Sequence, residues 1–144
     1  MTLIVKTITR LIVGLIFLYG IYVILHGHLT PGGGFAGGVI VAGAFVLLIL
    51  AEGIEEVARE LKKWRASFWE SFGIFCFWLL GMVGIFGGTY FLLNVIAKRY
   101  PGEPMHLFSA GIIPLCNVAI GIEVGAAIFA IVITLAVLKM GEKE

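Results

Sequence analysis

The chain has 144 residues, of which 60% are hydrophobic and 13% are charged, against roughly 45–50% and roughly 25% in an average soluble domain. A soluble domain of this size has too much surface for its volume to hide so many apolar side chains, which indicates that lipid surrounds most of the protein. The formal net charge of +1 gives no electrostatic basis for a nucleic-acid partner.

Four apolar runs are long enough to cross a bilayer as helices, for which about 20 residues are needed. They cover residues 3–25, 31–51, 72–96 and 112–138. All are too long for the roughly 9–11-residue strands of a membrane barrel, and none alternates polar and apolar residues. The first is also too long for the apolar core of a signal peptide, and no small-residue cleavage site follows it, so we expect it to be retained. The sequence therefore predicts an all-α integral membrane protein with four transmembrane helices in one domain, residues 1–144.

The basic residues predict the orientation of these four helices. With the N-terminus in the cytoplasm, Lys98 and Arg99 are the only two of the ten lysines and arginines that fall in outer segments. Because positive charge accumulates on the cytoplasmic side, both termini are expected there. The protein is accordingly expected to be a multi-pass protein of the cell membrane.

The segment between the second and third runs, residues 52–71, has helical periodicity. Its apolar side chains recur on one face and its charges lie on the other, which is typical of a cytoplasmic amphipathic helix on the membrane surface or against a partner. A long second helix that projects into water is an equal alternative. The charges from Glu52 to Glu70 are interpreted mainly as a solvated face, with docking to a cytoplasmic partner as the other possibility.

Residues 26–38, with the sequence HGHLTPGGGFAGG, are the most distinctive stretch. Gly32, Gly34 and Gly37 match the pattern GxGxxG, but a dinucleotide-binding motif follows a β-strand, whereas this stretch follows a predicted transmembrane helix. No Lys-Ser or Lys-Thr pair follows, which argues against a phosphate-binding loop. No nucleotide and no other cofactor is therefore expected.

Helix-capping preferences place the start of the second span within this stretch. Thr30 is a good N-cap and Pro31 a good first helical residue, so a tight hairpin is expected just before them. Glycines in the first turn weaken a helix by roughly 1 kcal/mol each relative to alanine. Their spacing favours close helix packing, with a hydrated path along exposed backbone N–H groups as the alternative. The glycine pairs four residues apart are Gly33 and Gly37, Gly34 and Gly38, Gly84 and Gly88, and Gly121 and Gly125, and Phe35 stands within the first two pairs.

The stretch resembles the GHxTPGGGFxGG motif of the MrpB (MnhB) subunit of multisubunit Na⁺/H⁺ antiporters, and the resemblance extends over essentially the whole chain. Residues 112–127, IIPLCNVAIGIEVGAA, are similar to that family's fourth span, in which an acidic residue stands two positions before a glycine. Here these residues are Glu123 and Gly125. Related subunits occur in archaeal membrane-bound respiratory complexes of the hydrogenase and sulfur-reducing types.

The resemblance implies a non-enzymatic subunit of a cation/proton antiporter module, with other membrane subunits as partners and Na⁺ and H⁺ as the transported ions. A purely structural subunit of such a module in a respiratory complex is the alternative. The resemblance leaves open whether the parent assembly is a stand-alone antiporter or a redox-driven pump, and which ion passes near this chain.

Glu123 is the first candidate for an ion path. It lies about a third of the way into the fourth span, where a charge costs a few kcal/mol unless protein or water shelters it. We expect a carboxylate that binds Na⁺ or relays H⁺, with a neutral glutamic acid bonded to a neighbouring subunit as the alternative. Asn117 points elsewhere on a regular helix, but it joins the same entrance if Pro114 distorts the backbone.

His28 is the remaining candidate, as a proton-responsive group at an aqueous mouth or as a hydrogen-bonding residue of the hairpin. No zinc site is expected, because His26 and His28 lack helical ligand spacing and Glu103 is the only acid nearby. No set of nucleophile and base has a plausible spacing for catalysis.

Overall fold

The computed structural model describes the chain except for residues 1, 54–62, 89, 103–104, 107–108 and 142–144. The described residues form helices and no β-strand. The helices are α1 (Leu3–His26), α2 (Gly34–Glu52), α4 (Lys63–Gly87), α5 (Val95–Arg99) and α6 (Ile113–Gly141). Within this described part, all of them except α5 are long and apolar enough to cross a membrane, which gives four candidate spans. The prediction of an all-α membrane protein with four spans is confirmed.

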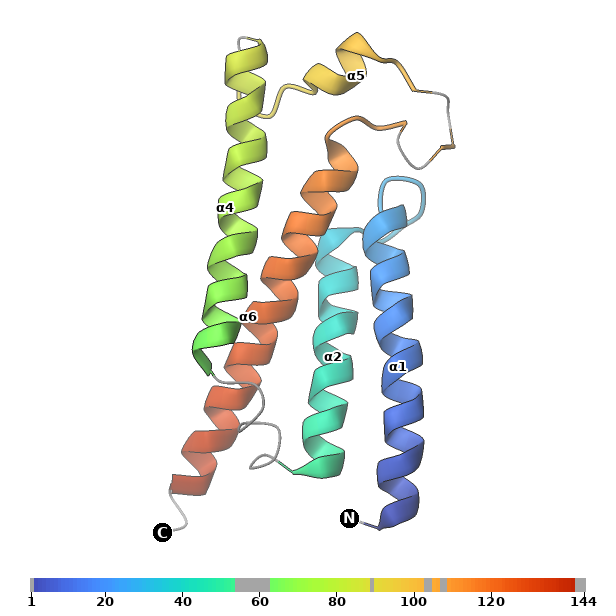
Figure 1. Ribbon diagram of the computed structural model, residues 1–144, viewed down its shortest axis with the longest axis vertical. Coiled ribbons are helices and arrows are strands. Elements are labelled where there is room, and N and C mark those ends of the chain that lie inside the picture. Colours follow the sequence, from blue (N-terminus) through green and yellow to red (C-terminus); the bar gives the residue numbers. More distant parts are fainter. Residues whose placement is uncertain (1, 54–62, 89, 103–104, 107–108, 142–144) are drawn as a thin grey trace.

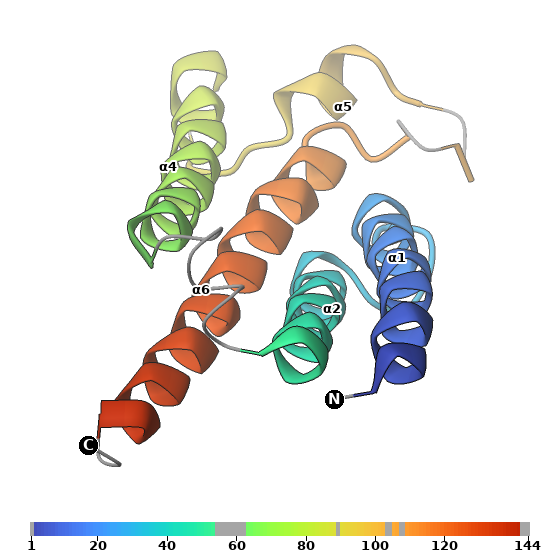
Figure 2. The same ribbon diagram turned by 60° about the horizontal axis from the view of Figure 1, so that its bottom comes forward.

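The long helices are arranged around α6, which contacts both α2 and α4 (Figure 1). Helix α1 packs mainly on α2, and α4 lies across α6 from both of them (Figure 2). The N-terminal end of α1 and the C-terminal end of α6 lie at the same end of the molecule (Figure 1). Side chains of α6 therefore reach two different interfaces, one with α1 and α2 and one with α4.

The third span is displaced from its predicted position. The sequence predicted residues 72–96, whereas α4 runs over Lys63–Gly87 and its apolar part over Ala66–Gly87. Residues 63–71 of the predicted amphipathic segment therefore belong to α4, and residues 54–62 lie outside the described residues. Hydropathy missed this start because the polar residues among 63–71 lowered the apolar average, although they continue the same helix.

The chain turns back after α4 instead of continuing the helix to residue 96. Leu92 has a φ of 59°, which a helix cannot accommodate, and its N–H donates to the carbonyl of Gly81 at 3.3 Å. Asn94 then caps the separate helix α5, since its Oδ1 accepts from the N–H of Ala97 at 3.0 Å. Gly84 and Gly88 pack against the returning segment around Leu93. The predicted apolar run thus combined a span and a folded-back segment.

The start of α2 also differs from the capping prediction. Gly33 is the N-cap, the helix begins at Gly34, and Thr30 and Pro31 lie outside it. The Thr30 hydroxyl donates instead to the carbonyl of His26 at 3.1 Å, so it satisfies the C-terminal end of α1. Gly32 and Gly33 have φ values of 152° and 114°, a conformation that side chains rarely adopt and that interrupts a helix. The capping prediction was wrong because these two residues extend the turn.

Glycines bring α2 close to both of its neighbours. Gly37 faces α1, where a Cβ would collide with Ile24. Gly34 and Gly38 face α6; a Cβ on Gly34 would collide with the Asn117 carbonyl, and one on Gly38 would lie 2.8 Å from the carbonyl oxygen of Gly121. Helix backbones approach this closely in membranes where interfacial residues are small. The glycines of α2 therefore set its distance from both helices.

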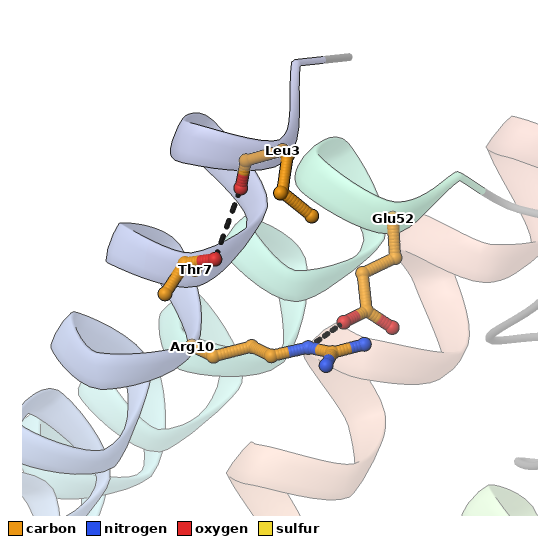
Figure 3. A network of polar contacts seen from close by, with 4 residues as sticks. All are labelled: Leu3, Thr7, Arg10 and Glu52. Atoms are coloured by element: carbon orange, nitrogen blue, oxygen red, sulfur yellow. Dashed lines mark hydrogen bonds and ion pairs between the residues drawn. The ribbon is translucent and has the colours of Figure 1, made fainter.

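An ion pair joins α1 to α2 at the end of the molecule that carries the termini. Arg10 Nε donates to Glu52 Oε1 at 2.5 Å (Figure 3). Glu52 is the last residue of α2, where the helix dipole disfavours a negative charge. The positive guanidinium of Arg10 offsets this unfavourable interaction. Glu52 therefore does not belong to a solvated face, because most of its side chain is covered in this pair.

Aromatic rings complete the packing of the three helices nearest this ion pair. Phe45 of α2 contacts Phe17 of α1 with ring centroids 5.9 Å apart, and Phe129 of α6 with centroids 5.4 Å apart. Phe129 also joins a buried cluster with Ile49 of α2 and Ala66 of α4. These contacts link α1, α2, α6 and the first turn of α4.

We predict that Gly34→Ala destabilises the protein by about 1–3 kcal/mol, because the added methyl group overpacks the α2–α6 contact. Gly43→Ala is the matched control on the same helix, since a Cβ there meets no heavy atom within 4 Å. Thermal unfolding of the purified protein in detergent measures both. Equal melting temperatures for the two variants would contradict the close-packing argument.

A double-mutant cycle tests the ion pair. Arg10→Gln and Glu52→Gln are each expected to lower the free energy of unfolding, and the double variant to lose less than their sum by about 1 kcal/mol. The loss has an electrostatic cause, because each single variant removes the attraction between the Arg10 guanidinium and the Glu52 carboxylate. Additivity within about 0.3 kcal/mol would show that the pair makes no net contribution.

Candidate functional site

Glu123 lies on the face of α6 that meets α4. Its backbone N and Cβ pack against Gly73, where an added Cβ would lie 2.8 Å from each of these atoms. The residue is half-buried and lies within the apolar part of α6, residues Ile113–Leu138. Because residue 73 is a glycine, α4 can approach the turn of α6 that carries Glu123 directly.

The Glu123 carboxylate has no hydrogen bond or ion pair with any other described residue. This distinguishes it from Glu52, whose charge Arg10 compensates. A carboxylate within a membrane span is stable only with a proton, a cation, water or a polar group from a neighbour. Glu123 can therefore take up a proton or a cation without first breaking a contact inside the described part of the chain.

Glu70 is a second carboxylate along the same interface, and it was not among the residues predicted from the sequence. It lies on α4 between Ala66, which packs in the cluster with Phe129, and Gly73, which packs against Glu123. Residues spaced by three or four share one face of a helix, so Glu70 lies on the side of α4 that faces α6. It is half-buried and within the apolar part of α4. We refer to this interface, with Glu70 and Glu123, as the α4–α6 seam.

The position of Glu70 could have been recognised from helical spacing alone. Once the helix is taken back to residue 63, Glu70 falls in line with the small residues Ala66 and Gly73, which mark a packed face. Its sequence neighbours instead suggested that Glu70 belongs with the charges of the predicted amphipathic segment. The displaced start of α4 was the cause of the error.

Asn117 lies at the opposite interface of α6, against the turn between α1 and α2. Its Nδ2 would be 2.9 Å from a Cβ on Gly27, and its carbonyl packs on Gly34. The Nδ2 group is buried and has no hydrogen-bond partner among the described residues. Pro114 is the second residue of α6, where proline is tolerated, and the helix continues regularly past it. The structure therefore does not bring Asn117 and Glu123 together; six residues of regular helix turn them to different sides.

His28 lies in the same turn as Gly27. Both of its ring nitrogens are buried and without a hydrogen-bond partner in the described part of the chain. His26 differs, because its Nδ1 lies 3.1 Å from the Tyr22 carbonyl and its ring stacks on that of Tyr22. A buried polar group left unpaired costs about 1–3 kcal/mol, so His28 and Asn117 are suited to bind water, an ion or a polar group of a neighbour.

The candidate residues thus form two polar places on opposite sides of α6. The α4–α6 seam offers carboxylates, which bind Na⁺ through oxygen or exchange a proton. The turn between α1 and α2 offers the imidazole of His28 and the amide of Asn117, whose buried nitrogens have no hydrogen-bond partner among the described residues. Both combinations are suited to handling small cations or protons.

Residues 4–138 match the protein family described as a domain related to the MnhB subunit of the Na⁺/H⁺ antiporter. An uncharacterized protein of Methanocaldococcus jannaschii is 38% identical over 113 residues, which cover 76% of this chain and 42% of that protein. A protein of Staphylococcus aureus strain Newman, named as antiporter subunit mnhB2, is 46% identical over 56 residues, which cover 39% of this chain and 40% of that protein.

The fold is similar to that of a chain in the solved structure of the membrane-bound sulfane sulfur reductase, an archaeal respiratory membrane complex. The TM-score is 0.79 at 34% sequence identity, and the match covers 94% of this chain and 58% of the other. The chain thus spans about two-fifths of the length of these curated relatives and somewhat over half of the structural one. Because the family match covers nearly the whole four-helix arrangement, the chain belongs to the family of domains related to the MnhB subunit of Na⁺/H⁺ antiporters.

Proposed function

We propose that this chain is a non-enzymatic subunit of a multisubunit cation/proton antiporter module in the cell membrane, where it contributes to a path for Na⁺ or H⁺. The observation that carries the proposal is the half-buried Glu123 carboxylate, which has no partner among the described residues although it lies within a membrane span. Nature retains ionisable groups at such positions chiefly for transport or proton relay. The family to which the chain belongs is named for an antiporter subunit.

The α4–α6 seam is the part of the path that we assign to this chain. Glu70 lies on the face of α4 that packs on α6, on the side of Gly73 that leads toward the start of α4. Two carboxylates along one interface allow a cation or proton to pass from one to the other with only partial dehydration. Glu123 and Glu70 would then act in sequence, with water between them.

His28 and Asn117 form the second polar place, which we assign to the mouth of a path at the end away from the termini. Their unpaired polar atoms lie at the tight turn between α1 and α2. If both termini are cytoplasmic, as the basic residues predict, this mouth faces outward. The other subunits of the module would provide the wall that connects this place with the seam.

Two kinds of parent assembly are compatible with the similarities. The S. aureus relative is named as an antiporter subunit, and the structural neighbour belongs to a respiratory complex with reductase activity. In both, the proposed role of this chain is to guide ions while other subunits supply the driving reaction. A purely structural role is the alternative, and the following variants separate the two.

We predict that Glu123→Gln preserves assembly but abolishes most Na⁺-dependent proton transport, because the amide keeps the size of the side chain and cannot carry the charge. The measurement is proton uptake into vesicles that contain the intact complex, with the amount of complex checked on a native gel. Glu123→Asp is expected to retain transport. Glu52→Gln is the control for loss of a carboxylate outside the seam, and it is expected to lower stability but to retain transport. Transport at the wild-type rate by Glu123→Gln would contradict a role of Glu123 in the ion path and would support a purely structural role for the chain.

Asn117→Leu tests the second polar place, and its expected effects on stability and on transport differ. Because Nδ2 makes no hydrogen bond within the described residues, its removal is expected to leave the melting temperature unchanged or to raise it. Transport is nevertheless expected to fall, since leucine removes the polar group from the mouth. Reduced stability together with unchanged transport would identify Asn117 as a packing residue only.

A further inference from the structure

The side of α4 that faces away from α6 is left uncovered by the described part of the chain. Helix α4 has α6 on one side and no described helix on the other (Figures 1 and 2). Phe75 follows Gly73 by two residues, which turn a helix by about 200°, so Phe75 points away from the contact of Gly73 with α6. We call this side the outer face of α4. Its large side chains, between 43% and 84% exposed, are Phe68, Phe75, Trp78, Leu79 and Phe86.

Trp78 lies near the middle of the apolar part of α4. It is twelve residues from Ala66 and nine from Gly87, and at 1.5 Å per residue these separations are roughly 18 Å and roughly 13 Å. Side chains of a helix lean toward its N-terminal end, so the indole points toward the middle of the span and not toward the nearer boundary. The hydrocarbon core of a bilayer is about 30 Å thick. The indole therefore does not reach water or lipid headgroups.

The indole N–H of Trp78 has no hydrogen-bond acceptor among the described residues. Phe75, which stacks on Trp78 with ring centroids 6.1 Å apart, has no acceptor in its side chain. A tryptophan N–H that is removed from water usually finds a partner, and lipid tails offer none. Trp69 differs, because it is only three residues from Ala66 and lies at the boundary level where tryptophan is enriched. Trp78 therefore requires an acceptor from outside the described chain.

We propose that a membrane-spanning helix of another subunit covers the outer face of α4 and accepts a hydrogen bond from the Trp78 indole. Lipid tails match the phenylalanine and leucine side chains of this face but leave the N–H unpaired at mid-depth. A neighbouring helix supplies the acceptor through a hydroxyl or amide side chain, or through a main-chain carbonyl beside a small residue. The partner is thus a helix with one polar or small position near its centre.

A second copy of this chain does not satisfy the same requirement. Two copies that met through their outer faces in one membrane would be related by a two-fold axis along the membrane normal, so residues of equal depth would face each other. At the depth of Trp78 this face offers Phe75, Leu79 and a second indole, which is a donor only. The acceptor must therefore come from a different chain.

This inference rests on the part of the proposed function that makes the chain a subunit of a membrane assembly, and it does not depend on the ion path. Glu70 and Glu123 lie in the α4–α6 seam, on the side of α4 that carries Gly73. The test is read from assembly and crosslinking and not from transport. Its failure would leave the role of Glu123 to be decided by the transport measurements.

Trp78→Phe tests the hydrogen bond in the intact complex, because it removes the indole N–H and keeps an aromatic ring. Membranes that contain the complex are extracted at increasing detergent concentration, and the intact assembly is quantified on a native gel. We expect the variant to lose the assembly at a several-fold lower detergent concentration than the wild type, with an equal amount of the chain in the membrane. Trp69→Phe is the matched control on the same helix and should behave as the wild type.

Photocrosslinking in the native membrane identifies the occupant of the outer face. Phe75 of the full chain is replaced by p-benzoylphenylalanine, the cells are irradiated, and the adduct is identified by mass spectrometry. We expect a crosslink to a membrane-spanning segment of a different subunit, with a hydroxyl, amide or glycine residue within one helical turn of the crosslinked position. An adduct with lipid alone or with a second copy of this chain would overturn the proposal. So would a Trp78→Phe complex that resists detergent as well as the Trp69→Phe complex does.

Discussion

Gly34 and Gly38 bring the backbone of α2 against that of α6, at Asn117 and Gly121. The rest of the molecule depends on this contact, because α6 is the helix on which both α2 and α4 pack. In a bilayer no hydrophobic force drives helices together, so close van der Waals contact between small residues must supply much of the association. The contact also fixes the rotation of α6, which directs Asn117 toward the turn between α1 and α2 and Glu123 toward α4.

The polar groups of the chain fall into two sets, one with a partner in the chain and one without a partner among the described residues. Arg10 and Glu52 compensate each other near one end of the molecule, and their contact joins two helices. Glu123, His28 and Asn117 retain polar atoms without partners in the described part of the chain. A paired charge stabilises the fold, whereas an unpaired polar group in a span or buried in a turn raises the free energy of the folded chain and is tolerated where function or a neighbouring subunit needs it. This contrast separates the structural polar residues from the functional candidates.

Local rules succeeded where one segment alone decided the outcome and failed where a distant segment took part. The four apolar runs were recognised because the length and hydropathy of a span are local properties. Thr30 and Pro31 were misplaced because the backbone at Gly32 and Gly33 extends the turn before α2 begins. The third span was misplaced because its start is polar and its apolar continuation folds back at Leu92. Glu70 was overlooked as a consequence.

The amino-acid sequence by itself determined the membrane environment, the number of spans, the family resemblance and the presence of a carboxylate within the last span. Each of these follows from composition, run length or a short motif, which do not depend on how the helices are arranged. Only the tertiary structure decided which neighbour each side of α6 faces, that Glu70 shares an interface with Glu123, and that Arg10 meets Glu52 across 42 positions of chain. Helix rotation and pairing are set by side-chain fit between segments, and a linear pattern does not contain that fit.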